Sequence, residues 1–216
     1  MILGIMGGMG PAATCDIYRK IIELTPAIKD QEHLHVIIDS NSQIPDRTQY
    51  ICGIGEDPRI EMTRSAIKLE MMGANYIIIP CHTAHYFYDD VVRYSKVKVL
   101  NMIHETATFL KIVKPNEQRF LLLATEGTHK CGIYKKVFQE FGLSIVEPDK
   151  SDIQTVMSWI YSIKAGKIDV NPTDFQVLVN KYMLNKKIPI ILGCTELPLL
   201  AEKIGVRSEC IDPVSI

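Results

Sequence analysis

The sequence predicts an α/β protein of two similar lobes, each a mainly parallel sheet flanked by helices. Short apolar runs of strand length alternate with amphipathic stretches of helix length, and this order begins again near residue 120. The first strands of the two halves end at Gly7 and Thr125, 118 positions apart, and cysteines that follow later strands lie 113 positions apart, at Cys81 and Cys194. These near-equal offsets favour a duplication with a pseudo-two-fold relation between the lobes.

The first lobe is expected to span residues 1–100. Pro11 suits the first turn of a helix over residues 12–24, because proline lacks the amide hydrogen that this turn leaves unpaired. Gly73 is suited to end a second helix that begins near Pro58, and a third helix follows the third strand. Apolar runs predict strands at residues 2–6, 35–38, 76–79 and 97–100.

The second lobe is expected to span residues 101–207, with a tail over about 208–216 that packs back on the first lobe. Its first apolar run ends in a polar turn, as the first run of the chain ends in a glycine-rich turn. Repetition of the strand–helix order indicates parallel strands. Strands are predicted at residues 120–124, 143–146 and 188–192, and helices at 132–141, 152–165 and 172–185.

The composition is that of an ordinary globular protein. The 216 residues are 47% hydrophobic and carry a formal net charge of −1, which gives no electrostatic argument for a nucleic-acid or membrane partner. No apolar run approaches the roughly 18 residues of a membrane-spanning helix, and no secretory signal pattern begins the sequence. We therefore expect a cytoplasmic protein with neither kind of partner.

Two of the six cysteines stand out by position. Cys81 follows the predicted strand 76–79 and Cys194 follows 188–192, at the end of the strands where an open α/β sheet places its ligand crevice. No two cysteines form a C-x-x-C pair, so zinc-ribbon and thioredoxin-type sites are not predicted. The remaining cysteines are expected to be structural: Cys15, Cys52, Cys131 and Cys210.

Two opposed cysteines suit the transfer of a proton between the two faces of a carbon atom. A racemase must remove the proton from the α-carbon of an amino acid on one side and return one on the other. The unperturbed thiol pKa of about 8.5 allows one thiolate and one thiol to coexist with modest tuning. We therefore predict Cys81 and Cys194 as an acid/base pair that faces one pocket.

Residues outside the cysteine motifs suit an acidic amino acid. Arg47 can hold a second carboxylate through two parallel hydrogen bonds, although a surface arginine explains this residue equally well. Lys164 is a second candidate cation, with a solvated helix-end lysine as the alternative. The turns at residues 7–10 and 125–128 offer backbone N–H groups to a carboxylate. The first turn does not match G-x-G-x-x-G, so a dinucleotide site is not predicted.

Metal binding is also not expected. His82 and His85 lie beside Cys81, but one cysteine and two histidines within five residues form a poor tetrahedral set.

Five motifs occur in order along the chain: Gly7-Gly8-Met9-Gly10-Pro11, Gln43-Ile44-Pro45-Asp46-Arg47-Thr48, Pro80-Cys81-x-Thr83-Ala84-His85-Tyr86, Thr125-x-Gly127-Thr128 and Gly193-Cys194-Thr195-Glu196-Leu197. With these motifs the chain resembles the cofactor-independent aspartate/glutamate racemase superfamily, and specifically its aspartate racemase branch. The resemblance implies two α/β lobes with the active site in the cleft between them, no pyridoxal phosphate, no metal and often a homodimer. It also implies that Cys81 and Cys194 are the paired acid/base residues and that Arg47 anchors the side-chain carboxylate.

Two differences from glutamate racemases favour the aspartate branch. Those enzymes usually open with Asp-Ser-Gly and carry histidine where this chain has Glu196. One position departs from the aspartate branch, which usually has asparagine where this chain has His82, a bulkier and ionisable residue. The expected substrate-binding residues are Met9, Gly10, Gln43, Arg47, His82, Thr83, Thr125, Gly127, Thr128, Lys164, Thr195 and Glu196.

The predicted reaction is therefore the interconversion of L- and D-aspartate, with glutamate as a further substrate, in a homodimer without cofactors. Two alternatives remain open. The same fold acts on other amino acids, on hydantoins or on maleate as a cis–trans isomerase in related enzymes. The second alternative is a catalytically weakened protein that binds an acidic metabolite, in which His82 marks the loss of activity.

Overall fold

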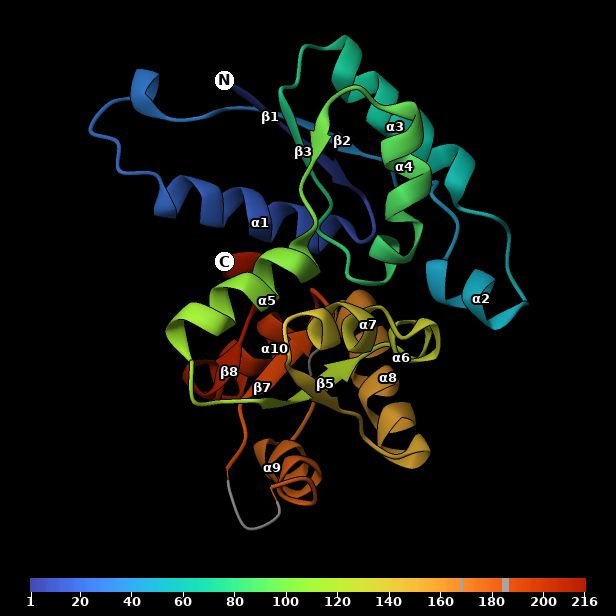
Figure 1. Cartoon of the computed structure of the whole chain (residues 1–216), viewed down its shortest axis with the longest axis vertical. Coiled ribbons are helices and arrows are strands. Elements are labelled where there is room, and N and C mark those ends of the chain that lie inside the picture. The colour runs from blue at the N-terminus through green and yellow to red at the C-terminus, as the bar shows by residue number, and fades with distance from the viewer. Residues whose placement is uncertain (168, 184–186) are drawn as a thin grey trace. The chain divides into compact units, whose positions relative to one another are not determined.

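The computed structural model describes residues 1–167, 169–183 and 187–216. The chain forms two compact units (Figure 1). Unit 1 comprises Met1–Met102 with Ser215, and unit 2 comprises Ile103–Val214 with Ile216. Residues 184 and 185, at the end of the helix predicted over 172–185, lie outside the described residues.

Unit 1 is built on a parallel sheet in the order β2–β1–β3–β4. The central pair places Leu3 opposite Tyr76 and Ile5 opposite Ile78, so both strands point toward the same edge of the sheet. A purely parallel sheet needs a crossover between consecutive strands, which the helices provide. The strands are β1 (Ile2–Gly7), β2 (His35–Ser40), β3 (Tyr76–Ile78) and β4 (Lys98–Val99).

The helices of unit 1 pack apolar faces on this sheet. In α3, Met62, Ala66 and Leu69 recur at helical spacing and share one buried cluster with Ile77 of β3. The residues after β3, where we expected a helix, first form a 3₁₀ helix, Thr83–Phe87, and the α-helix begins only at Tyr88. The α-helices are α1 (Pro11–Leu24), α2 (Arg47–Cys52), α3 (Arg59–Met71) and α4 (Tyr88–Tyr94), and a second 3₁₀ turn spans Asp30–Glu32.

Unit 2 repeats the same sheet, in the order β6–β5–β7–β8 and again parallel. Strand for strand, β5 takes the place of β1 and β7 that of β3, so Cys81 and Cys194 follow equivalent strands. The tail, which we expected on the first lobe, contributes β8 to this sheet, where Cys210 and Ile211 pair with Ile190 and Ile191 at the edge of β7. The strands are β5 (Arg119–Ala124), β6 (Ser144–Val146), β7 (Ile190–Gly193) and β8 (Cys210–Ile211).

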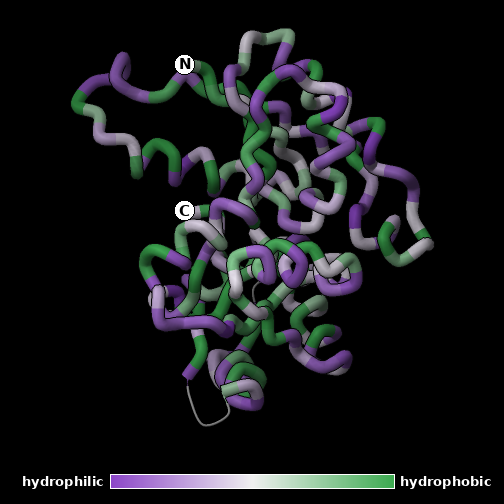
Figure 2. Tube along the Cα trace, in the orientation of Figure 1, coloured by the Kyte–Doolittle hydropathy of each residue, from purple (hydrophilic) through white to green (hydrophobic). Residues whose placement is uncertain are grey.

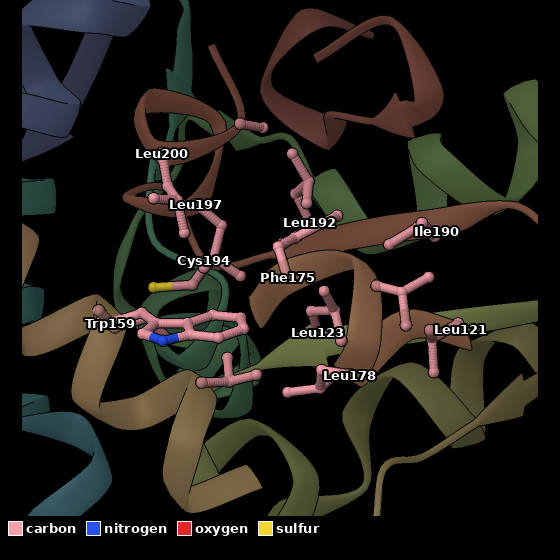
Figure 3. Close-up of a cluster of buried hydrophobic side chains, with 14 of the residues drawn as sticks. Leu121, Leu123, Trp159, Phe175, Leu178, Ile190, Leu192, Cys194, Leu197 and Leu200 are labelled. Atoms are coloured by element: carbon pink, nitrogen blue, oxygen red, sulfur yellow. The ribbon is translucent and has the colours of Figure 1, made fainter. Parts of the chain in front are cut away.

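Both faces of the second sheet are covered by apolar side chains. Leu121 and Leu123 of β5 point into one buried cluster, whereas Phe120 and Leu122 point into another, as the two-residue period of a strand requires. Figure 3 shows the first cluster, in which Trp159 and Phe175 lie against the leucines of the sheet.

The helices of unit 2 differ from prediction at several places: those over 102–113 and 197–203 were not predicted, and the helix that begins at Pro172 ends at Asn180 instead of residue 185. The helix predicted over 132–141 is preceded by a further short helix, and Gly132, with φ of 65°, separates the two. Figure 2 shows the mixture of hydrophobic and hydrophilic residues along the helices. No helix among the described residues is long and apolar enough to cross a membrane. The helices are α5 (Met102–Val113), α6 (Glu126–Cys131), α7 (Ile133–Glu140), α8 (Lys150–Lys164), α9 (Pro172–Asn180) and α10 (Leu197–Lys203), with 3₁₀ turns at Arg207–Glu209 and Pro213–Ser215.

Candidate active site

Cys81 lies beyond the carboxyl end of β3, in the position that the sequence predicts. Its side chain is buried, at 6% exposure, and its backbone N–H donates to the carbonyl of Ile79 at 2.8 Å. Cys81 shares its buried cluster with Met9 and Ile44, which come from the turn after β1 and the loop after β2. The ends of three neighbouring strands therefore supply the surroundings of this thiol.

His85 fixes the backbone of Cys81. Its Nδ1 lies 2.9 Å from the Cys81 carbonyl oxygen, and the backbone N–H of Met102 donates to its Nε2 at 3.1 Å. Because Nε2 accepts, the ring proton lies on Nδ1 and donates to Cys81. Burial lowers the pKa of His85 to about 4, so the ring is neutral at physiological pH. Our site prediction missed this role, although the four-residue spacing from Cys81 in a helical turn could have indicated it.

His82 and Thr83, both predicted at the site, are buried next to Cys81. Burial, and to a lesser extent the neighbouring His85, lower the pKa of His82 to about 3. His82 is therefore neutral at physiological pH and brings bulk without charge to the position where asparagine was expected. No cluster of three or more metal-ligating side chains occurs among the described residues.

Arg47 is a buried cation, and some of its N–H groups have no hydrogen-bond acceptor. It is the first residue of α2, which Asp46 caps by accepting from the Gln49 N–H at 3.0 Å. The guanidinium donates to the carbonyls of Ile44, Pro45 and Met9 at 3.3, 3.0 and 3.1 Å. Nε is buried without a hydrogen-bond partner, and Arg47 has no acidic partner in the described part of the chain. Of the five N–H donors of a guanidinium, two remain for an incoming acceptor.

The turn after β1 holds Met9 and Gly10 in place. Gly8 has a φ of 87°, and a Cβ there would lie 2.3 Å from the backbone carbon of Asn41, so a glycine is required on both counts. Thr14 accepts from the Gly8 N–H at 2.9 Å and donates to the Gly10 carbonyl at 3.0 Å.

Two further predicted residues lie in this part of unit 1. The Met9 carbonyl is occupied by Arg47, as described above. Gln43 is exposed, and its backbone N–H donates to the side chain of Asn41 at 3.1 Å.

Cys194 of unit 2 belongs to a network of polar side chains. Its Sγ donates to Glu196 Oε2 at 3.0 Å, and the Thr195 hydroxyl donates to the same oxygen at 3.3 Å. The other carboxylate oxygen lies 3.8 Å from Lys164 Nζ, at the end of α8. Burial first, and then the negative charge of Glu196, raise the pKa of the Cys194 thiol well above its usual range, while Lys164 opposes the shift. Cys194 is therefore a protonated thiol in this environment.

The threonine turn lies at the same edge of the second sheet. Ala124 of β5 pairs with Gly193 of β7, so the next residues, Thr125 and Cys194, leave neighbouring strands together. Thr125 Oγ1 accepts from the backbone N–H of Thr128 at 3.2 Å, and the two hydroxyls are 3.0 Å apart. Gly127, which lies between these two threonines in the sequence, is also buried. Each unit thus gathers one cysteine and its predicted neighbours at the carboxyl ends of its own strands.

Comparisons with known proteins agree with these motifs. Residues 6–216 match the family described as Asp/Glu/hydantoin racemase. The broad specificity amino-acid racemase RacX of Bacillus subtilis (strain 168) is 29% identical over 220 residues, which cover 98% of this chain and 92% of that protein.

Solved structures show the same fold. The aspartate racemase of Picrophilus torridus is 31% identical with a TM-score of 0.81, over 99% of this chain and 89% of that one. An aspartate racemase homologue from Pyrococcus horikoshii OT3 is 28% identical with a TM-score of 0.76, over 99% and 93% of the two chains. A glutamate racemase from Campylobacter jejuni subsp. jejuni, at 17% identity and a TM-score of 0.66 over 100% and 81%, shares the fold alone.

Proposed function

Because this chain belongs to the Asp/Glu/hydantoin racemase family and is an amino-acid racemase, we propose that its substrate is aspartate. The observation that carries this proposal is the Arg47 guanidinium. It is buried, it has no acidic partner among the described residues, and Nε together with one further N–H is available. A buried cation of this kind is stabilised by an anionic ligand, and its planar fork matches a carboxylate. The two solved relatives at 31% and 28% identity are an aspartate racemase and an aspartate racemase homologue, which supports this substrate.

The proposed reaction moves protons at one carbon without a cofactor. The thiolate of one cysteine removes the α-proton, and the thiol of the other gives a proton to the opposite face. We assign these roles to Cys81 and Cys194, which follow equivalent strands of the two sheets. Arg47 is proposed to hold the side-chain carboxylate, so that the α-carbon presents its two faces to the two sulfur atoms. The threonine turn and the residues beside each cysteine are proposed to contact the remainder of the substrate.

The test is proton exchange at the α-carbon. L-Aspartate is incubated with the reduced protein in D₂O, the Cα–H signal is followed by proton NMR, and the product is analysed on a chiral column. We expect the signal to disappear and D-aspartate to form. Cys81→Ser and Cys194→Ser should each lower racemisation about 10²- to 10⁴-fold, the range that acid/base groups contribute. Cys15→Ser, at an exposed cysteine, is the control.

An active C81S/C194S double variant would refute the mechanism. Formation of fumarate from maleate, with aspartate unchanged, would instead select the isomerase alternative. Tight binding of aspartate without exchange would select the binding-protein alternative.

A second candidate is racemisation of a wider set of amino acids. It is favoured by the ion pair between Lys164 and Glu196, which leaves the positive charge of Lys164 partly neutralised before any substrate binds. The similarity to RacX over nearly the whole chain supports it as well. The rates of α-proton exchange for aspartate, glutamate, alanine and lysine separate the two candidates. An aspartate racemase should exchange aspartate at least about tenfold faster than the other three, a difference of about 1.4 kcal/mol in free energy.

We also propose that the enzyme acts in the cytoplasm as a homodimer. The six free cysteines suit a reducing compartment, and the dimer is an expectation from the resemblance of the sequence motifs alone. Sedimentation of the reduced protein at several concentrations tests the assembly, and a monomer at every concentration would refute it.

A further inference from the structure

We propose that Glu196 is a positioning residue that keeps Cys194 protonated between turnovers, so that Cys194 begins the cycle as the proton donor, and that Lys164 limits this effect. The inference rests on the proposed two-cysteine reaction and specifies which of the two cysteines carries a proton before the reaction begins. It assigns the resting proton to one of two thiols that the reaction alone treats as equivalent.

The contacts of Glu196 carry the argument. Its carboxylate is 97% buried, as the side chain has an exposure of 3%, and one oxygen accepts both from Cys194 Sγ at 3.0 Å and from the Thr195 hydroxyl at 3.3 Å. A carboxylate in this position gains a hydrogen bond while Cys194 is a thiol. It loses that bond and faces a like charge when Cys194 becomes a thiolate.

The groups around Cys194 determine the sign of the effect. Glu196 lies on the same segment, and Lys164 of α8 reaches its second oxygen at 3.8 Å with a side chain that is 30% exposed. Burial first, and then the charges of Asp212 and the Cys194 thiolate, raise the pKa of Tyr134 of α7 well above its usual range, so this neighbouring phenol stays neutral. The neighbours from β7 and α10 in the buried cluster, such as Leu192 and Leu197, are apolar. After burial, the Glu196 carboxylate is thus the group that favours the thiol, whereas Lys164 and, to a lesser extent, the backbone N–H of Glu196 oppose the shift.

The proton balance follows directly. When Cys194 protonates the α-carbanion, its S–H bond breaks, the C–H bond forms and the electron pair stays on sulfur. The new thiolate then lies beside the Glu196 carboxylate, which favours the return of a proton. Water supplies that proton, and the Cys81 thiol that formed in the first step gives one back to water. The enzyme is restored with Cys194 protonated, and no proton is gained or lost overall.

The single tryptophan of the chain provides the readout. Trp159 of α8 belongs to the same buried cluster as Cys194, and Figure 3 shows the Cys194 sulfur directed toward its indole ring. A thiolate quenches indole emission more strongly than a thiol does. Trp159 emission as a function of pH therefore reports the ionisation of Cys194 without any need for activity, and Cys194→Ser should abolish the transition.

Two variants should shift the midpoint of this titration in opposite directions. Glu196→Gln keeps the shape of the side chain and removes its charge, so the midpoint should fall by about one to three pH units. Lys164→Met removes the opposing charge, so the midpoint should rise. Glu196→Asp retains a carboxylate and should remain closer to the wild type than E196Q does. Glu202→Gln, at an exposed residue of α10, is the matched control and should leave the midpoint unchanged.

The alkaline limb of α-proton exchange should move with the fluorescence midpoint in E196Q. Equal midpoints for the wild type, E196Q and E202Q would overturn the proposal, as would shifts of E196Q and K164M in the same direction. If E196Q does not fold, a K164M midpoint equal to or below that of the wild type would overturn the proposed role of Lys164, and an E196D midpoint equal to that of the wild type would support the role of the carboxylate charge. Failure of the racemase proposal is distinguishable, because absence of aspartate exchange leaves the titration measurable, whereas unchanged midpoints in an active racemase refute only the role of Glu196.

Discussion

Replacement of Arg47 tests the substrate assignment most directly. Three of its five donors bind the carbonyls of Ile44, Pro45 and Met9, which leaves two for a substrate carboxylate. Each hydrogen bond to a charged group contributes about 1.5–3 kcal/mol. Arg47→Met removes both, or about 3–6 kcal/mol, and should lower kcat/KM for aspartate by about 10²- to 10⁴-fold. Arg47→Lys keeps the charge but not the fork, and loss of one bond should cost about 10- to 150-fold.

The assay compares aspartate with alanine, which lacks the second carboxylate. Alanine exchange in D₂O should change less than about tenfold in both variants, because Arg47 is not proposed to touch its remaining groups. Arg64→Lys, at an exposed arginine that pairs with Glu61, controls for the substitution itself. Circular dichroism must show that R47M is folded, since three backbone carbonyls lose a donor. An equal loss for aspartate and alanine in a folded R47M variant would refute the assignment.

Further predictions concern the turn after β1 and the buried histidines. Gly8→Ala should destabilise the protein by more than about 2 kcal/mol, because its Cβ would lie 2.3 Å from the Asn41 backbone. Gly53→Ala, at a φ of 84° with no atom within 4 Å of the added Cβ, should cost only about 1 kcal/mol. Chemical denaturation measures the unfolding free energy of both variants, and equal losses would argue against the clash at Gly8. His82 and His85 have pKa values of about 3 and 4, below the 6.5 of an unfolded histidine, so the unfolded chain binds more protons in this interval and stability falls as pH decreases below about 6.5. From pH 7 to pH 5 each should cost about 2 kcal/mol of unfolding free energy. His82→Asn should remove one of these contributions, and an unchanged acid loss in that variant would contradict the interpretation.

The sequence was informative where a pattern depends on local chemistry. Apolar runs predicted the strands, and position after a strand was sufficient to distinguish Cys81 and Cys194 from the other cysteines. Helix starts were less predictable because they depend on side-chain caps. Thr125, for example, accepts from the Thr128 N–H and so begins a helix inside the turn that we expected.

Individual side-chain contacts were harder to predict than the elements that carry them. His85 binds the carbonyl of Cys81 and the N–H of Met102, and the second of these contacts spans 17 residues. Glu196 was predicted to bind substrate, but its bond to the Cys194 thiol depends on how the chain turns after β7. The contact with Met102 depends on tertiary structure, and that of Glu196 depends on the local turn, so neither follows from a hydrophobic period.

The order of the strands along the chain has a consequence for biosynthesis. Every strand of the first sheet lies within residues 2–99, and every described strand of the second lies within residues 119–211. Neither sheet therefore waits for a strand from the other half, and the first can form while the second is still being translated. The turn that carries Cys81 is then expected to fold on the nascent chain, whereas Cys194 gains its complete sheet only after β8 has left the ribosome.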